Sequence, residues 1–251
     1  MEIASLQKGL VLVVDGVEVI EEGAGFGVPV LKYSDKTFFS RTATVCIKEQ
    51  NEESVLIEKV FLLDSVSRKR LHGLSINDSF YSVFHRIFEA AYLQSGKLRS
   101  LFDWTMRLRK MIGVETLFVK ISPRGKVTVQ YSCYPDHVKV CVDFSLVDMD
   151  HCREILVLNE QGASFFRKIR SVNQVLQDRE IGAYMKSVSG FLEFSDLGGH
   201  ISFSVEKSDC SSLYFGWEQV DGRFSWAGIN YALSPNTLMF NYTIRLKETV
   251  I

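Results

Sequence analysis

The longest helical pattern in this chain runs from residue 77 to residue 113, and β-patterned sequence lies on both sides of it. Apolar residues recur at three- and four-residue steps over 80–92, and the same spacing resumes after Gly96 and continues to residue 112. Glycine commonly ends a helix because it adopts a left-handed backbone conformation without strain. The pattern therefore predicts a pair of amphipathic helices over about 78–112, joined at Gly96, whose apolar face packs on a sheet.

Short runs of β-branched and aromatic residues, separated by turn residues, fill the rest of the chain. Residues 172–185 fit a short helix less clearly, because Gly182 interrupts the pattern. Regularly spaced short strands are typical of a β-sandwich or a barrel. The predicted strands are 10–14, 17–20, 37–47, 55–66, 116–121, 127–134, 137–147, 154–158, 163–169, 191–194, 199–205, 213–220, 224–233 and 238–247. The strands 154–158 and 163–169 are predicted to form a hairpin, joined by a turn at residues 159–162.

These elements predict a mainly antiparallel β (α+β) fold, a large β-sandwich with the helix pair inserted near its middle. No internal repeat, low-complexity tract or linker divides the sequence, so we expect one domain over residues 1–251. In strand count and length the chain resembles large two-sheet proteins such as the galactose-mutarotase-like supersandwiches. That resemblance is one of architecture alone, and what it implies is a carbohydrate ligand, with no catalytic residue carried over.

Composition places the chain among ordinary globular proteins, with 46% hydrophobic and 24% charged residues. The formal net charge of −1 argues against a nucleic-acid partner, which would require a clustered basic surface. The apolar run at 10–14 is too short for a membrane span or a signal peptide, so we expect a soluble, cytoplasmic protein. Five widely spread cysteines, an odd number, indicate reduced thiols that are mostly buried and inert.

Two glycine-containing segments predict local backbone geometry. Asp15-Gly16 lies between two strand patterns and predicts a two-residue hairpin turn. Residues 23–27 have the spacing GxGxG where a dinucleotide-binding loop has GxGxxG, and extended sequence follows where that loop requires a helix. We therefore expect a bend or bulge at residues 23–27, where glycine allows a close backbone approach.

Metal binding is not predicted. Cys133, His137 and Cys141 are the nearest grouping of metal-ligand residue types, but strand alternation puts Cys133 on the apolar side of its strand, away from the other two. No CxxC pair supports a zinc site. We expect no metal and no cofactor.

The carboxy-terminal strands hold the most specific candidate site. A two-residue turn at Asp221-Gly222 would place Trp217 directly opposite Trp226, with Gln219 and Asn230 on the same face. Flat rings mixed with amides suit the apolar face and the hydroxyl rim of a sugar. The favoured function is therefore binding of a carbohydrate or related small ligand on an aromatic-lined sheet face, although large aromatic residues also commonly fill a core.

Two further hypotheses belong to other classes of function. The first is a sugar-active enzyme (an epimerase, lyase or hydrolase). Its acid and base would come from Glu218, Asp143, His137, His72 and His85, with Glu218 as the candidate general acid. A surface glutamate without chemistry explains Glu218 equally, and the sequence contains no GxSxG, P-loop, HExxH or CxxC motif. The second is an interaction module that presents the basic helix pair to an acidic protein or nucleic acid. Its residues would be Arg68, Lys69, Arg70, Lys97, Arg99 and Arg107.

Overall fold

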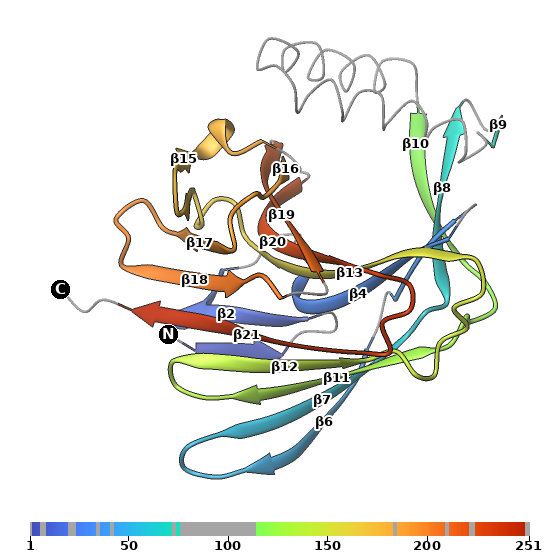
Figure 1. Ribbon diagram of the computed structural model, residues 1–251, viewed down its shortest axis with the longest axis horizontal. Coiled ribbons are helices and arrows are strands. Elements are labelled where there is room, and N and C mark those ends of the chain that lie inside the picture. Colours follow the sequence, from blue (N-terminus) through green and yellow to red (C-terminus); the bar gives the residue numbers. More distant parts are fainter. Residues whose placement is uncertain are drawn as a thin grey trace.

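The chain forms two large antiparallel β-sheets in a computed structural model (Figure 1). The structure describes residues 2–5, 9–19, 24–33, 36–40, 43–71, 74–75, 114–182, 185–208, 211–220 and 224–248. The predicted class, a mainly antiparallel β-sandwich, is confirmed. The predicted helix pair at 78–112 lies outside the described residues. Within those residues the helical structure is one 3-10 turn, η2 (Asp178–Glu180).

Twelve strands make up the first sheet, here called sheet A, in the described part of the chain. Its main strand order is β10-β8-β5-β4-β13-β20-β19-β16, and β1, β2, β3 and β9 join at its sides. Their bounds are β1 (Glu2–Ser5), β2 (Leu10–Val14), β3 (Val17–Glu18), β4 (Gly25–Tyr33), β5 (Thr37–Phe39), β8 (Ser65–Leu71), β9 (Leu74–Ser75), β10 (Val114–Lys120), β13 (Cys152–Gln161), β16 (Met185–Lys186), β19 (Ser211–Val220) and β20 (Phe224–Leu233). In Figure 1, β8 and β10 extend together from one end of this sheet.

Nine strands make up the second sheet, sheet B, in the same described ranges. Its order is β15-β14-β17-β18-β21-β12-β11-β7-β6. Their bounds are β6 (Ala43–Gln50), β7 (Val55–Leu62), β11 (Lys126–Cys133), β12 (His137–Asp143), β14 (Lys168–Ser171), β15 (Val175–Gln177), β17 (Phe191–Ser195), β18 (Ile201–Glu206) and β21 (Met239–Glu248).

Aromatic side chains join the two sheets in the core. Phe26 of sheet A packs edge-on against Phe203 of sheet B, with ring centroids 5.2 Å apart. Tyr231 of sheet A meets Phe240 of sheet B in the same way at 4.9 Å. Edge-to-face pairs add to the free energy gained by burying large apolar side chains. The side of each sheet that faces away from this core is called its outer face below.

The predicted hairpin at Asp15-Gly16 is confirmed. Val14 of β2 pairs with Val17 of β3, and Asp15 and Gly16 have φ angles of 52° and 76°. Positive φ at both central residues is the geometry that a two-residue turn of this kind requires, because it matches the twist of the flanking strands.

The described part of the glycine-rich segment, residues 24–27, leads into an irregular strand. Gly25 and Gly27 have φ angles of 81° and 78° within β4. The register of the neighbouring strand β13 shifts between Leu158 and Asn159. The amide of Gly27 donates to Asn159 Oδ1 at 3.1 Å. A distortion of both strands is therefore held by a side-chain hydrogen bond, as expected where glycine allows a bulge.

Asn159 also connects the two sheets. The hydroxyl of Tyr242, on β21 of sheet B, donates to Asn159 Oδ1 at 2.7 Å. Burial raises the pKa of Tyr242 well above its usual range, so this hydroxyl stays a neutral donor. Nearby, the Tyr131 hydroxyl of β11 donates to the Phe26 carbonyl of β4 at 2.9 Å. Two buried tyrosines of one sheet thus satisfy polar groups at the distorted strands of the other.

Two predicted strands were wrong in their extent. The sequence predicts single strands over 37–47 and 55–66, but each is divided between the sheets, as β5 and β6 and as β7 and β8. Asp64, only 7% exposed, lies at the second division, where its backbone amide donates to Leu62 and its carbonyl accepts from Ile121. Continuous apolar sequence persists across such a corner because both sheets need core-facing residues there.

The predicted hairpin of 154–158 with 163–169 was also wrong. Residues Asn159, Glu160 and Gln161 look like a polar turn, but they continue β13. Gln161 is fully buried, where its Oε1 accepts from the Leu12 amide at 3.2 Å and its Nε2 donates to the Leu10 carbonyl at 3.3 Å. A side-chain amide that bonds to a neighbouring backbone is tolerated inside a sheet.

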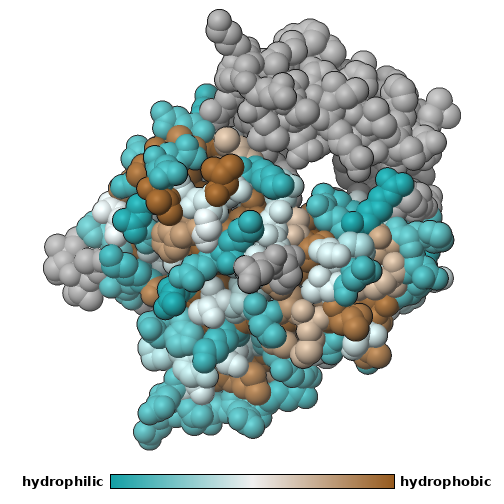
Figure 2. Space-filling model, in the orientation of Figure 1, coloured by the Kyte–Doolittle hydropathy of each residue, from teal (hydrophilic) through white to brown (hydrophobic). Residues whose placement is uncertain are grey.

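Most of the surface seen in Figure 2 is hydrophilic, with hydrophobic residues gathered over β15. Val172 and Val175, beside and within β15, are 74% and 51% exposed. Singly exposed apolar residues are normal on a protein surface. The polar outer faces of the sheets are therefore the better candidates for a functional site.

Candidate functional site

The hairpin of β19 and β20 has a register one residue away from the predicted one. Val220 pairs with Phe224, so Trp217 lies opposite Ala227 and Glu218 lies opposite Trp226. The predicted pairing of Trp217 with Trp226 was wrong because three residues, 221–223, separate the last paired positions where a two-residue turn was assumed. A one-residue shift moves a side chain to the opposite face of the sheet.

Trp217 is a core residue. It is 8% exposed, belongs to the buried cluster between the sheets, and donates from Nε1 to the Ala163 carbonyl at 2.9 Å. Gln219 lies exposed at the end of β19, opposite Ser225. Neither residue lies on the same face as Trp226.

Trp226 and Glu218 meet on the outer face of sheet A. The indole Nε1 of Trp226 donates to Glu218 Oε2 at 3.2 Å. Trp226 is only 7% exposed, yet it is not part of the apolar cluster between the sheets. A buried tryptophan outside the core, bonded to a carboxylate, makes this face different from an ordinary solvated sheet face.

Asn230 and Glu160 complete this group. The buried Asn230 accepts from the Asn159 amide at 2.9 Å through Oδ1, which fixes the orientation of its amide. Its Nδ2 then points to Glu160 Oε1, 3.5 Å away, and the other Glu160 oxygen accepts from the Ala24 amide at 3.1 Å. Both carboxylates of the group are thus positioned by neutral donors.

One strand, β20, separates the strands that carry Glu160 and Glu218. Gly228 of β20 pairs with Glu160 on one side and with Gly216 of β19 on the other. A Cβ atom added to Gly228 would lie 2.7 Å from Glu160 Cγ, so the glutamate side chain occupies the space over this glycine. From strand spacing, the Cα atoms of Glu160 and Glu218 are about 12 Å apart. We call Glu160, Glu218, Trp226 and Asn230 the outer site.

Sequence reasoning found three members of the outer site and missed Glu160. It grouped Trp226 with Asn230 correctly, but it assigned Glu218 to the opposite face through the shifted register. Glu160 was placed in a turn with Asn159 and Gln161, although it lies within β13. The sequence did contain a signal for Glu160, because three polar residues, 159–161, follow directly after the apolar residues 155–158.

The other predicted catalytic residues that the structure describes lie elsewhere, and His72 and His85 lie outside the described residues. His137 and Asp143 are at opposite ends of β12, on the outer face of sheet B, whereas Glu218 is on sheet A. His137 Nδ1 lies 2.6 Å from Asp136 Oδ1, and this hydrogen bond lowers the pKa of Asp136. Asp143 accepts from the Ser145 amide at 2.8 Å. The structure therefore does not bring these three residues into one site.

The thiols that the structure describes are of two kinds. Burial raises the pKa of Cys133 to about 11 and also raises those of Cys141 and Cys152, which keeps all three protonated at neutral pH. Cys46 is exposed on β6. Within the described ranges no three His, Cys, Asp or Glu side chains group closely enough to hold a metal ion. Among these same residues, no helix is long and apolar enough to cross a membrane.

Comparison with known proteins gives little. No protein-family model matches the chain, and no curated protein matches it. A crystal structure described as "Crystal Structure Analysis of HI1317" is similar over 82% of this chain, with a TM-score of 0.39 and 6% sequence identity. The chain covers 65% of that protein's length.

Proposed function

We propose that the outer site of sheet A binds a small polyhydroxylated ligand, with saccharides as the expected class. The observation that carries the proposal is the position of Glu160 and Glu218 on one face, with Trp226 and the buried Asn230 beside them and one strand, β20, between them. Carboxylates accept strong hydrogen bonds from hydroxyl groups, and an asparagine amide both donates and accepts. Trp226, which is 7% exposed, holds the Glu218 carboxylate in position through its Nε1.

Similarity to the galactose-mutarotase-like supersandwiches, and the inserted helix pair, remain part of this proposal. Two antiparallel sheets of twelve and nine described strands support the architectural comparison. The helix pair would lie between β9 and β10, whose partner strand β8 is common to both.

Isothermal titration calorimetry with a panel of mono- and oligosaccharides tests the proposal. We expect one or more saccharides to bind the full chain, and Glu160→Gln and Glu218→Gln each to weaken binding about 10- to 100-fold. That range corresponds to loss of a charged hydrogen-bond acceptor, about 1.5–3 kcal/mol.

Glu154→Gln is the matched control, because Glu154 lies on the same strand as Glu160 and pairs with Lys32 at 2.8 Å. Its affinity should equal that of the unaltered chain. Equal affinity in Glu160→Gln, Glu218→Gln and Glu154→Gln would show that the ligand binds elsewhere. Binding of simple quaternary amines in preference to sugars would contradict the ligand class, since carboxylates with tryptophan also suit cations.

A second candidate function is acid–base catalysis on the same ligand, favoured by the two carboxylates on one face. General acid–base groups typically contribute 10²- to 10⁴-fold to a rate. Glu160→Gln and Glu218→Gln should then lower kcat by at least about 100-fold for a bound sugar that is converted. Full turnover in both variants would exclude this role.

The interaction-module hypothesis stays a prediction. Arg68, Lys69 and Arg70 lie on β8, where they pair with Leu117, Thr116 and Glu115 of β10. Lys97, Arg99 and Arg107 lie outside the described residues. Salt-independent binding to an acidic partner would contradict the hypothesis, because exposed charges are screened by salt.

A further inference from the structure

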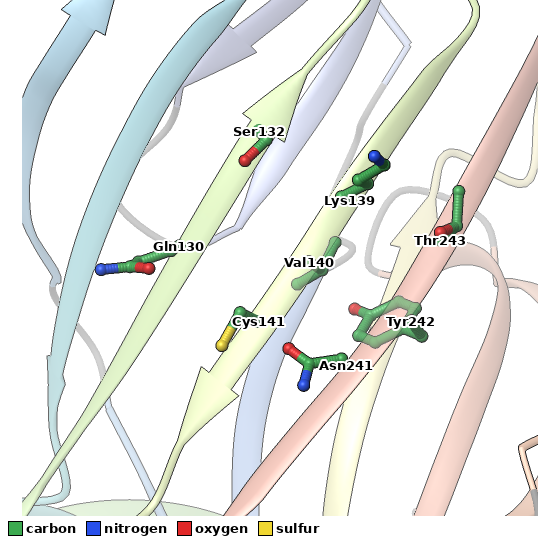
Figure 3. A pocket seen from close by; sticks show the side chains of 8 residues that line it. All are labelled: Gln130, Ser132, Lys139, Val140, Cys141, Asn241, Tyr242 and Thr243. Atoms are coloured by element: carbon green, nitrogen blue, oxygen red, sulfur yellow. The ribbon is translucent and has the colours of Figure 1, made fainter.

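The outer face of sheet B is hollowed along β21 (Figure 3). One hollow, of about 380 Å³, extends over β11 and β12, and a second, of about 190 Å³, extends over β18. They share Asn241, Tyr242 and Thr243, so they join into one shallow depression. The remaining lining residues are Gln130, Ser132, Lys139, Val140 and Cys141 in the first and Ser204, Val205, Glu206, Ser208 and Arg245 in the second.

Two cationic side chains flank a hydroxyl in this depression. Lys139 pairs with Thr243 across β12 and β21, and Arg245 follows Thr243 by two residues on the same face. Diagonal neighbours of this kind are about 7–8 Å apart at the backbone, within reach of one ligand by long side chains. Figure 3 shows Lys139 and Thr243 on the same side of their neighbouring strands.

The charges around these residues leave the depression cationic. Its acidic lining residue, Glu206, lies 3.8 Å from Arg245, and both side chains are about two-thirds exposed, so the pair is weak. Asp136, the acid near His137, is engaged by that histidine at 2.6 Å. The Lys139 ammonium lies 5.3 Å from the centre of the Tyr134 ring. This cation–π contact favours an ammonium position close to the surface of the strands.

We infer that this depression binds an oxyanion of the phosphate type, either free or as an ester, through Lys139, Thr243 and Arg245. An ammonium, a hydroxyl and a guanidinium on one face of β12 and β21 supply hydrogen-bond donors to an oxyanion. The site is separate from the outer site of sheet A and does not depend on the function proposed there.

Nitrogen-15 NMR of the full chain, titrated with inorganic phosphate and with phenyl phosphate at constant ionic strength, tests the inference. We expect saturable shifts of the amides of Lys139, Thr243 and Arg245, with a dissociation constant in the millimolar range. Lys139→Gln and Arg245→Gln should each weaken binding at least about fivefold. Tighter binding of phenyl phosphate would identify an ester as the preferred form, and tighter binding of inorganic phosphate would identify the free ion.

Lys247→Gln provides the matched control, because Lys247 is exposed on the same face of β21 but does not line the depression. Its affinity should not change. An equal loss in Lys247→Gln would show that only general electrostatic attraction is measured, and it would overturn the inference. So would shifts that chloride reproduces at the same ionic strength.

Discussion

Gly27 of sheet A lies directly against Tyr131 of sheet B at the distorted strands. A Cβ at this position would lie 2.7 Å from the Tyr131 hydroxyl, and φ is 78°. We predict that Gly27→Ala lowers the free energy of unfolding by about 2–5 kcal/mol, from backbone strain together with overpacking. Urea denaturation followed by circular dichroism measures this change.

Gly16→Ala separates the two causes. Gly16 has nearly the same φ, 76°, but an added Cβ would meet nothing within 4 Å. Its cost should be only about 1–2 kcal/mol, the strain alone. Equal costs at both positions would contradict the close contact between Gly27 and Tyr131.

Lys59 is a fully buried residue of β7, and its ammonium donates to the Gly9 carbonyl at 2.8 Å. Burial lowers its pKa from 10.5 to about 8. Between pH 8 and pH 10.5 the folded chain has released this proton and the unfolded chain still holds it. Stability contributed by this group therefore rises with pH across that window, by an amount on the order of 3 kcal/mol.

Lys59→Met removes the titrating group while keeping an apolar stem of similar length. We predict that the unfolding free energy of the native chain, minus that of the variant, increases between pH 7.5 and pH 10 in urea titrations. Taking the difference cancels the thiols and tyrosines that titrate in both proteins. A difference that stays flat or falls would contradict a neutral Lys59 in the fold at high pH.

At the scale of elements, β13 and β21 are joined by one buried hydrogen bond, from Tyr242 to Asn159. Tyr242→Phe should lower the unfolding free energy by about 1–2 kcal/mol, because Asn159 Oδ1 then keeps only the Gly27 amide as donor. Tyr134→Phe is the comparison, since Tyr134 stacks on His137 near the surface. Thermal unfolding measures the loss of stability in each variant. An equal loss in Tyr242→Phe and Tyr134→Phe would argue against the hydrogen bond between the sheets.

Local patterns predicted those elements whose signals are local. The strand over 224–233 was predicted with the bounds that β20 has, and positive φ at Asp15 and Gly16 followed from residue type. The division of residues 55–66 between two sheets could not be predicted, because apolar alternation is the same on either sheet. The polar residues of β13 also misled, since their hydrogen-bond partners are 70 to 151 residues away in sequence.

The candidate site shows how one residue of register decides chemistry. The face around Trp226 was expected to contain Trp217 and instead contains Glu218, since Val220 pairs with Phe224. The register follows from the three residues, 221–223, between the paired positions Val220 and Phe224. Asp221-Gly222 instead favours a two-residue turn by composition. Glu160 joins the face only through the pairing of β13 with β20, which no local pattern encodes.

At the scale of the whole molecule, the two sheets present different outer faces. Sheet A carries two half-buried carboxylates with a buried indole and a buried amide, while sheet B carries an open depression with Lys139 and Arg245. Because the core lies between them, ligands at the two sites would not touch. Binding at one site is therefore expected to leave affinity at the other unchanged, since no described contact links Glu218 with Thr243.

Intrinsic fluorescence of a Trp217→Phe protein, titrated with saccharides, tests the central claim most directly, because it removes the signal of the core tryptophan and leaves those of Trp226 and Trp104. The account predicts a saturable change in emission with at least one saccharide. It also predicts that the change disappears when Trp226→Phe is added and the fold is retained by circular dichroism. A response that survives the loss of Trp226, or no response to any saccharide in the panel, would contradict the placement of a sugar site on sheet A.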